Sequence, residues 1–188
     1  MSLLALLVLA AVSPAAVTGA GDDDKSACPG APSMAVEAAC RTACGTQAMY
    51  DMCKDELAAA VPDPLRDRDV TVYAVAGEKG ALASVGATQD AAIRLLLRNS
   101  SLSGEERDAY VECVEAYTTA EHAMGNVLDK LGVCSRDGLA ADYKDGLLDI
   151  ESCRDRVLKL PASPLYAMVL VDRNKAALAF FLGELLGI

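Results

Sequence analysis

The stretch SGEERDAYVECVEAYTTAEHAMGNVLDKLG, residues 103–132, predicts a long amphipathic helix with a defined start and end. Ser103 and Glu106 have the spacing of a capping box, in which each side chain binds a backbone N–H at the helix start. Gly132 is a natural stop for the same helix. Steps of three and four residues give this helix a single apolar face, made up of Tyr110, Cys113, Tyr117, Ala120, Met124, Val127 and Leu131.

Three more long helices are predicted around this one. Residues 66–98 carry a helical repeat of apolar and small residues, on a face whose glycines and alanines allow close approach of a neighbour. Residues 137–159 align Leu139, Tyr143 and Cys153, and Ser163-Pro164 places a cap and a first-turn proline before a last helix that ends near residue 186. Because the connections are short, we expect an all-α protein in which consecutive helices are antiparallel neighbours.

A short helical hairpin is predicted before these four helices. Ser33 can cap a first helix that ends near Thr42, and a turn at Gly45 leads to a second helix over residues 49–60. Pro62 and Pro64 end the second helix.

The N-terminus has the pattern of a secretory signal peptide. Residues 1–20 are uncharged and apolar, and small residues at Thr18-Gly19-Ala20 fit a cleavage site. The run is too short for a membrane span and contains Pro14, so we expect no membrane attachment of the mature chain. Residues 21–32 then form a flexible leader unless Cys28 is tied down. The mature chain is expected in an oxidising compartment, where cysteines form disulfides.

All seven cysteines lie after the predicted signal peptide. Cys113 and Cys153 are equally distant from the predicted turn near residue 133, which places them opposite each other in an antiparallel helix pair. Cys40 is favoured over Cys44 as the partner of Cys53, because its pairing is centred on the turn at Gly45. One bridge can form among the remaining set, and at least one cysteine stays unpaired. If Cys40 pairs with Cys53, as favoured, the remaining set is Cys28, Cys44 and Cys134. If Cys44 pairs with Cys53, Cys40 takes its place in that set.

Composition and motifs argue against several classes of function. A net charge of −10 and a pI near 4.5 disfavour nucleic acid and anionic lipid as partners. The chain has no Cys-x-x-Cys pair, phosphate loop or nucleophile motif, and His122, its one histidine, is expected on the solvent side of a helix. We therefore expect no enzyme, no cofactor and no metal site. Asn99-Ser100-Ser101 is an N-glycosylation sequence in a predicted loop.

The chain resembles the plant family of invertase inhibitors and pectin methylesterase inhibitors over residues 33–188, in particular its pollen-allergen-like branch. The residues that carry the resemblance are Val36-x-x-x-Cys40, Tyr50-Asp51-Met52-Cys53, Cys113-Val114-Glu115-Ala116-Tyr117, Glu151-Ser152-Cys153 and Asn174-Lys175-Ala176-Ala177-Leu178-Ala179. The resemblance implies an up-down four-helix bundle with an N-terminal helical hairpin, stapled by Cys40–Cys53 and Cys113–Cys153. It also implies a non-catalytic protein that blocks a cell-wall enzyme in a one-to-one complex.

The resemblance leaves the target enzyme open. Residues 133–139 read VCSRDGL where invertase inhibitors carry Pro-Lys-Phe, and residues 148–152 read LDIES in place of the usual Thr-Asn-x-x-Thr. Pectin methylesterase is the favoured target, with steric occlusion of its cleft, and acid invertase of the cell wall or vacuole is the alternative. A non-inhibitory secreted protein, either structural or a carrier of small apolar ligands, is the third reading. The expected location is the apoplast or cell wall, with the vacuole as the alternative.

Exposed positions on the helix over residues 103–132 are the expected contacts with an enzyme partner. Their spacing of three and four places them along one side of that helix. They are Glu112, Glu115, Thr119, His122 and Asn126.

Overall fold

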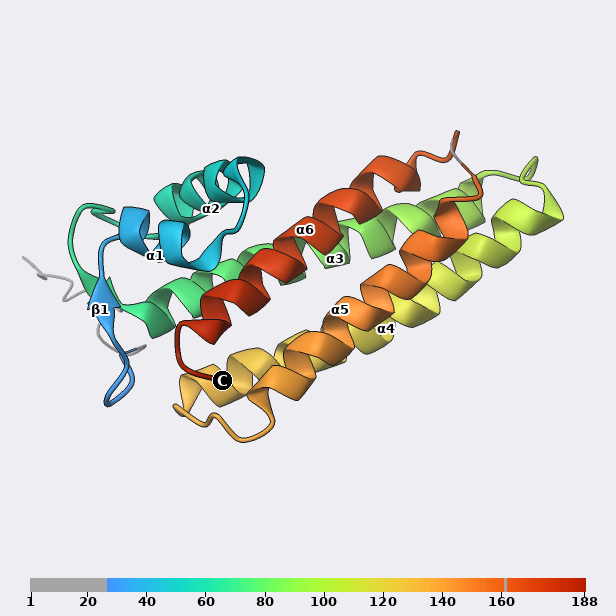
Figure 1. The fold of residues 1–188 in the computed structure, drawn as a ribbon. Coiled ribbons are helices and arrows are strands. Elements are labelled where there is room, and N and C mark those ends of the chain that lie inside the picture. Colours follow the sequence, from blue (N-terminus) through green and yellow to red (C-terminus); the bar gives the residue numbers. More distant parts are fainter. Residues whose placement is uncertain (1–26, 161) are drawn as a thin grey trace, which may run out of the picture.

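The computed structural model describes residues 27–160 and 162–188, and four long helices in it form an elongated up-and-down bundle (Figure 1). These helices are α3 (Val70–Arg98), α4 (Gly104–Gly132), α5 (Leu139–Val157) and α6 (Leu165–Glu184). Each packs against two of the others, in the closed order α3–α4–α5–α6–α3. The predicted all-α, up-down four-helix architecture is confirmed.

A helical hairpin lies beside one end of the bundle, as the sequence predicts. It consists of α1 (Val36–Ala43) and α2 (Gln47–Ala60), which pack against α3 and α6 (Figure 1). Two contacts attach the hairpin and the segment before it to the bundle. The Tyr73 hydroxyl donates to the carbonyl of Met34 at 2.6 Å, and Lys175 pairs with Glu56 at 2.7 Å.

The predicted cap at Ser33 is wrong. Ser33–Met34 forms the short strand β1, which pairs antiparallel with β2 (Arg68–Asp69), and α1 begins three residues after Ser33. The β2 segment also delays α3, which begins at Val70 and not at residue 66. Asp69 caps α3 by accepting from the backbone N–H of Thr71 at 2.7 Å.

The local signals at the other helix ends are reproduced more closely. Ser103 and Glu106 form both halves of the capping box, and α4 ends at Gly132. Ser163 lies one residue outside the cap position of α6, which is Pro164, but its hydroxyl still accepts from the backbone N–H of Leu165 at 3.2 Å.

Three disulfides link the described parts of the chain. Cys113 of α4 is bonded to Cys153 of α5, and Cys40 of α1 to Cys53 of α2, which are the pairs that hairpin symmetry favours. A third bridge joins Cys28 to Cys134 in the α4–α5 turn, and Cys44 remains a free thiol. The bonded Cys28 also donates its backbone N–H to Asp69, so the end of the predicted leader nearest α1 is held on the bundle.

Small residues in the core let the helices approach closely. A Cβ atom added at Gly77 of α3 would lie 2.8 Å from the Leu182 side chain of α6. At Gly183 of α6, an added Cβ would lie 2.6 Å from the ring of Tyr143. The space left by these glycines is therefore filled by neighbouring side chains.

The predicted signal peptide, residues 1–20, and residues 21–26 of the leader lie outside the described residues. No helix within residues 27–160 and 162–188 is both long and apolar enough to span a membrane.

Candidate functional site

The predicted contact residues lie in one stripe along α4, and most of them face solvent. Glu115, Thr119, His122 and Asn126 are exposed, and Glu112 is partly covered. The buried side of α4 carries every residue of the predicted apolar face, from Tyr110 to Leu131. The tertiary packing that fixes the buried side therefore also fixes which side chains α4 presents outward.

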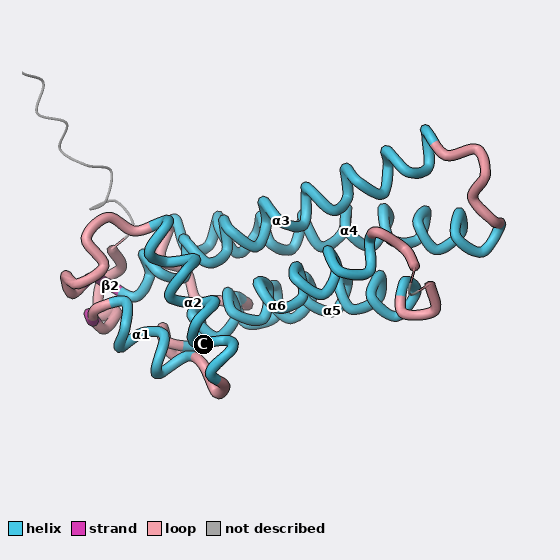
Figure 2. The backbone as a smooth tube through the Cα atoms, turned by 90° about the horizontal axis from the view of Figure 1, so that it is seen from above, coloured by secondary structure: helices cyan, strands magenta, loops and turns pink. Residues whose placement is uncertain are grey.

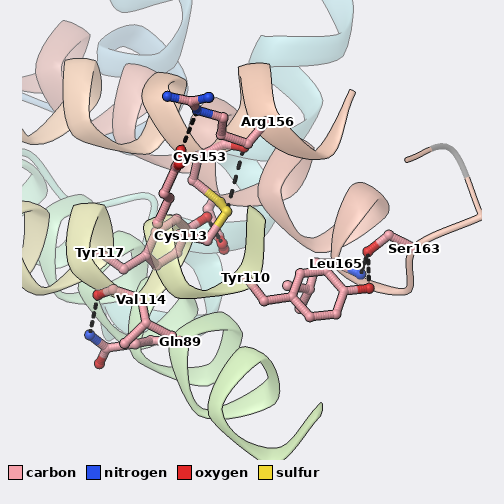
Figure 3. Close-up of a disulfide and its surroundings, with 11 residues drawn as sticks. Gln89, Tyr110, Cys113, Val114, Tyr117, Cys153, Arg156, Ser163 and Leu165 are labelled. Carbon is pink, nitrogen blue, oxygen red and sulfur yellow. Dashed lines mark hydrogen bonds and ion pairs between the residues drawn. A yellow bond between two sulfur atoms is a disulfide. The ribbon is translucent and has the colours of Figure 1, made fainter. Parts of the chain in front are cut away.

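Side chains from both neighbouring helices reach α4. On the α5 side, the Arg156 guanidinium pairs with the Glu112 carboxylate at 2.5 Å, beside the Cys113–Cys153 bridge (Figure 3). From α3, the Gln89 amide donates to the Val114 carbonyl at 3.2 Å and to the Thr118 hydroxyl at 2.8 Å. These contacts and the bridge connect α4 to both neighbouring helices.

The charge of this surface is acidic. The Glu112 carboxylate is neutralised by Arg156, whereas Glu115 has no ion pair among the described residues. The stripe therefore offers one free carboxylate, a hydroxyl, an imidazole and an amide, which suit a polar or basic partner surface.

A buried polar cluster lies inside the bundle and was missed by the sequence reasoning. The Asp172 carboxylate of α6, which is 1% exposed, accepts from the Ser84 hydroxyl at 2.5 Å and from the Tyr117 hydroxyl at 2.8 Å. Burial, and secondarily Asp172, raises the pKa of Tyr117, so its hydroxyl stays protonated as a donor. The cluster links α3, α4 and α6 across the core.

A second buried polar cluster, made of Glu78 and Tyr143, was also missed. Glu78 of α3 is 1% exposed, and its Oε1 atom has no hydrogen-bond partner. Burial raises the pKa of Glu78 to about 8, so the carboxyl is kept neutral at ordinary pH. The hydroxyl of the nearby Tyr143 is also unpartnered, and burial with the charge of Glu78 raises the pKa of Tyr143.

Helical spacing was the signal that could have revealed both carboxyl groups. Glu78 continues the buried positions Ala74, Ala81 and Val85 in steps of four and three. Asp172 follows Val169 by three residues in the same way. A carboxylate in a buried register must be paired or neutralised, which both of these are.

Neither cluster contains a Ser-His-Asp arrangement. Ser84 and Asp172 lack an adjacent histidine, because the one histidine of the chain, His122, lies on the exposed side of α4. The described residues contain no group of His, Cys, Asp and Glu side chains arranged to hold a metal ion. The carboxyl groups of both clusters lie in the bundle core.

The turn between α4 and α5 is held at several points. Cys134 is bonded to Cys28, Lys130 of α4 pairs with Asp142 of α5, and Gly138 takes a left-handed conformation with φ of 67°. The turn therefore has a covalent link to Cys28, and an ion pair joins the two helices that it connects.

Asn99 lies at the opposite end of the bundle from the hairpin. It is the first residue after α3, in the connection to α4, and the Ser101 backbone and hydroxyl both donate to its Oδ1 atom, at 3.1 Å and 2.7 Å. The sequence-predicted site residues thus fall in three separate places: the outer side of α4, the disulfides, and this end loop.

Together these features define a class of protein: a disulfide-linked, four-helix bundle with an N-terminal helical hairpin. No protein-family model matches the chain, and no curated protein matches it in sequence.

Among solved structures, this chain is similar to the crystal structure of a mutant form of a pectin methylesterase inhibitor from Arabidopsis. The TM-score is 0.67 at 15% sequence identity, over 81% of this chain and 98% of the inhibitor chain. The chain therefore has the fold of this inhibitor, as the sequence resemblance implied.

Proposed function

We propose that this chain is a secreted, non-catalytic inhibitor of pectin methylesterase that covers the enzyme's cleft in a one-to-one complex. The observation that carries the proposal is the similarity of nearly the whole Arabidopsis inhibitor chain to this bundle and hairpin. The disulfides are consistent with export, and the apoplast or cell wall is the proposed location.

The outer side of α4 is the proposed contact surface. Neighbouring helices contact it on both sides, because Arg156 of α5 pairs with the Glu112 side chain and Gln89 of α3 donates to the Val114 carbonyl, so little order has to be gained on binding. A pre-ordered surface loses less conformational entropy when a complex forms. Steric occlusion needs only such a surface and a complementary cleft, and no reacting group.

Acid invertase is the weaker of the two target enzymes. The 133–139 segment lacks Pro-Lys-Phe, and it is tied down by the Cys28–Cys134 bridge and the Lys130–Asp142 pair. A carrier of small apolar ligands is disfavoured, because the space beside Gly77 and Gly183 in the core is already filled.

The test is an inhibition assay of the secreted protein against purified pectin methylesterase and acid invertase. The variant Glu115→Lys/His122→Glu changes the side chains at two exposed positions of α4, reversing the charge at Glu115 and placing a carboxylate at His122. It should weaken inhibition at least about tenfold, which corresponds to about 1.4 kcal/mol. The matched control is Glu184→Lys, which changes an exposed charge at the end of α6 and should inhibit normally.

Unchanged inhibition by the α4 variant would show that α4 is not part of the interface, but it would not contradict the inhibitor function. Inhibition of invertase alone would replace the proposed target. A correctly folded protein that inhibits neither enzyme would rule out the inhibitor function.

A further inference from the structure

The loop between α3 and α4 combines three features that the inhibitor role does not use. It contains the sequence Asn99-Ser100-Ser101, and it lies at the end of the bundle away from the hairpin (Figures 1 and 2). It also borders an open groove. The groove has a volume of about 350 Å³ and lies between the end of α3 and the start of α6. It is lined by Ala91, Arg94, Leu95, Arg98, Asn99, Pro164, Leu165 and Met168.

We propose that Asn99 carries an N-linked glycan whose first sugar packs into this groove. The Ser101 hydroxyl lies 2.7 Å from the Asn99 Oδ1 atom, so the third residue of the acceptor sequence already contacts the acceptor amide. The Asn99 Nδ2 atom, which would be glycosylated, makes no hydrogen bond in the described structure. Ser100 and Ser101 are exposed, which leaves the loop open to a transferase.

The chemistry requires a sugar donor of the secretory pathway, namely a lipid-linked oligosaccharide diphosphate. The Asn99 Nδ2 atom attacks C1 of the first sugar and forms the C–N bond while the C1–O bond to the diphosphate breaks. The diphosphate leaves with the bonding electron pair, and Nδ2 loses one proton. The transfer takes place in the secretory pathway, so it rests on the predicted signal peptide but not on the inhibitor function.

The groove suits a sugar that is tethered at its edge. Leu95, Pro164 and Met168 offer apolar surface to the C–H face of a pyranose ring. Arg94 and Arg98 offer guanidinium donors to its hydroxyl and N-acetyl oxygens. A volume near 350 Å³ is at the lower end of the range for small-ligand sites, which fits one or two sugar units. Asn99 itself lines the groove, so an attached sugar needs no long linker to reach it.

The covalent part of the proposal is tested by secreting the full chain from a plant cell culture and measuring its intact mass. We expect a mass increase that an amidase specific for N-glycans removes. Ser101→Ala and Asn99→Gln should lose the increase. Ser100→Ala keeps the acceptor sequence and should retain it, which makes it the matched control. Secreted wild-type protein with the unmodified mass would overturn the proposal.

The groove part is tested with two enzymes that trim the glycan differently. An endoglycosidase that leaves one sugar on Asn99 should preserve the melting temperature of the glycosylated protein. Complete removal should lower the melting temperature by roughly 2–4 °C. The variant Arg98→Ala/Met168→Ala should show a smaller difference between the two treatments. Equal melting temperatures of the wild-type protein after both treatments would show that the sugar does not pack in the groove.

Discussion

At the residue scale, the least expected feature is the buried Glu78 carboxyl. Its raised pKa, near 8, means that the folded protein holds a proton more tightly than the unfolded chain, where a glutamate titrates near its model value of 4.5. Well below pH 4.5 the carboxyl is neutral in both states, so it adds no pH dependence to the stability there. As the pH rises from 4.5 to about 8, the unfolded chain is stabilised by ionisation and the folded state is not, so stability falls.

Replacing Glu78 by glutamine should remove this pH dependence. Relative to the wild type, the free energy of unfolding of Glu78→Gln should rise between pH 5 and pH 8, with a slope of up to about 1.4 kcal/mol per pH unit. Chemical denaturation at several pH values measures it, with Glu115→Gln on the surface as the control. Parallel curves for the wild type and Glu78→Gln would show that Glu78 titrates normally.

Gly183 supports a second prediction at this scale. Because an added Cβ would lie 2.6 Å from the Tyr143 ring, Gly183→Ala should force the ring to move and destabilise the fold by roughly 1–3 kcal/mol. Gly125 in α4 has no atom within 4 Å of an added Cβ, so Gly125→Ala should instead stabilise by roughly 0.5–1 kcal/mol. Thermal unfolding of the two variants gives the comparison, and a stabilised Gly183→Ala would contradict the packing described.

At the scale of the elements, local sequence signals predicted the helices well, but they could not predict the pairing of segments that are far apart in the sequence. The α4 capping box works because Ser103 and Glu106 need only each other and their own backbone. Ser33 could have capped a helix, but its strand pairs with Asp69, a partner that no local pattern reveals. Glu78 and Asp172 occupy buried positions of apolar helical repeats, and an apolar repeat by itself does not indicate that a carboxyl group lies within it.

Removal of the Cys40–Cys53 bridge and removal of the Cys113–Cys153 bridge should have different effects. Cys40–Cys53 closes a separation of 13 residues within the α1–α2 hairpin, whereas Cys113–Cys153 closes 40 residues between two bundle helices. From the loop-closure entropy, the Cys40–Cys53 bridge should stabilise the folded state by about 3 kcal/mol and the Cys113–Cys153 bridge by about 4 kcal/mol. Cys40→Ala/Cys53→Ala should lose amide protection in α1 and α2 alone, and Cys113→Ala/Cys153→Ala should lose it across the bundle.

Hydrogen exchange followed by mass spectrometry resolves the two patterns. Loss of protection in α3–α6 after removal of the Cys40–Cys53 bridge would show that the hairpin and the bundle unfold as one unit.

At the scale of the whole molecule, the fold could be predicted and much of the functional surface could not. Helical periodicity and loop length predict the bundle. The symmetry of the α1–α2 and α4–α5 helix pairs predicts the Cys40–Cys53 and Cys113–Cys153 bridges. The third bridge could not be derived, because Cys28 and Cys134 are 106 residues apart and belong to no common hairpin. The partner surface depends on a second molecule, and the positions on α4 alone do not specify that molecule.

The arrangement of the bridges also determines which fragments a protease can release. A cut in the loop between α3 and α4 separates Cys28 from Cys134 along the chain, yet the bond between them keeps both halves in one molecule. Such a nicked protein should run as a single band on a denaturing gel without reductant and as two bands with it. A cut between α5 and α6 should give two bands even without reductant. The reason is that α6 contains no cysteine, so no disulfide holds it once the fold is denatured.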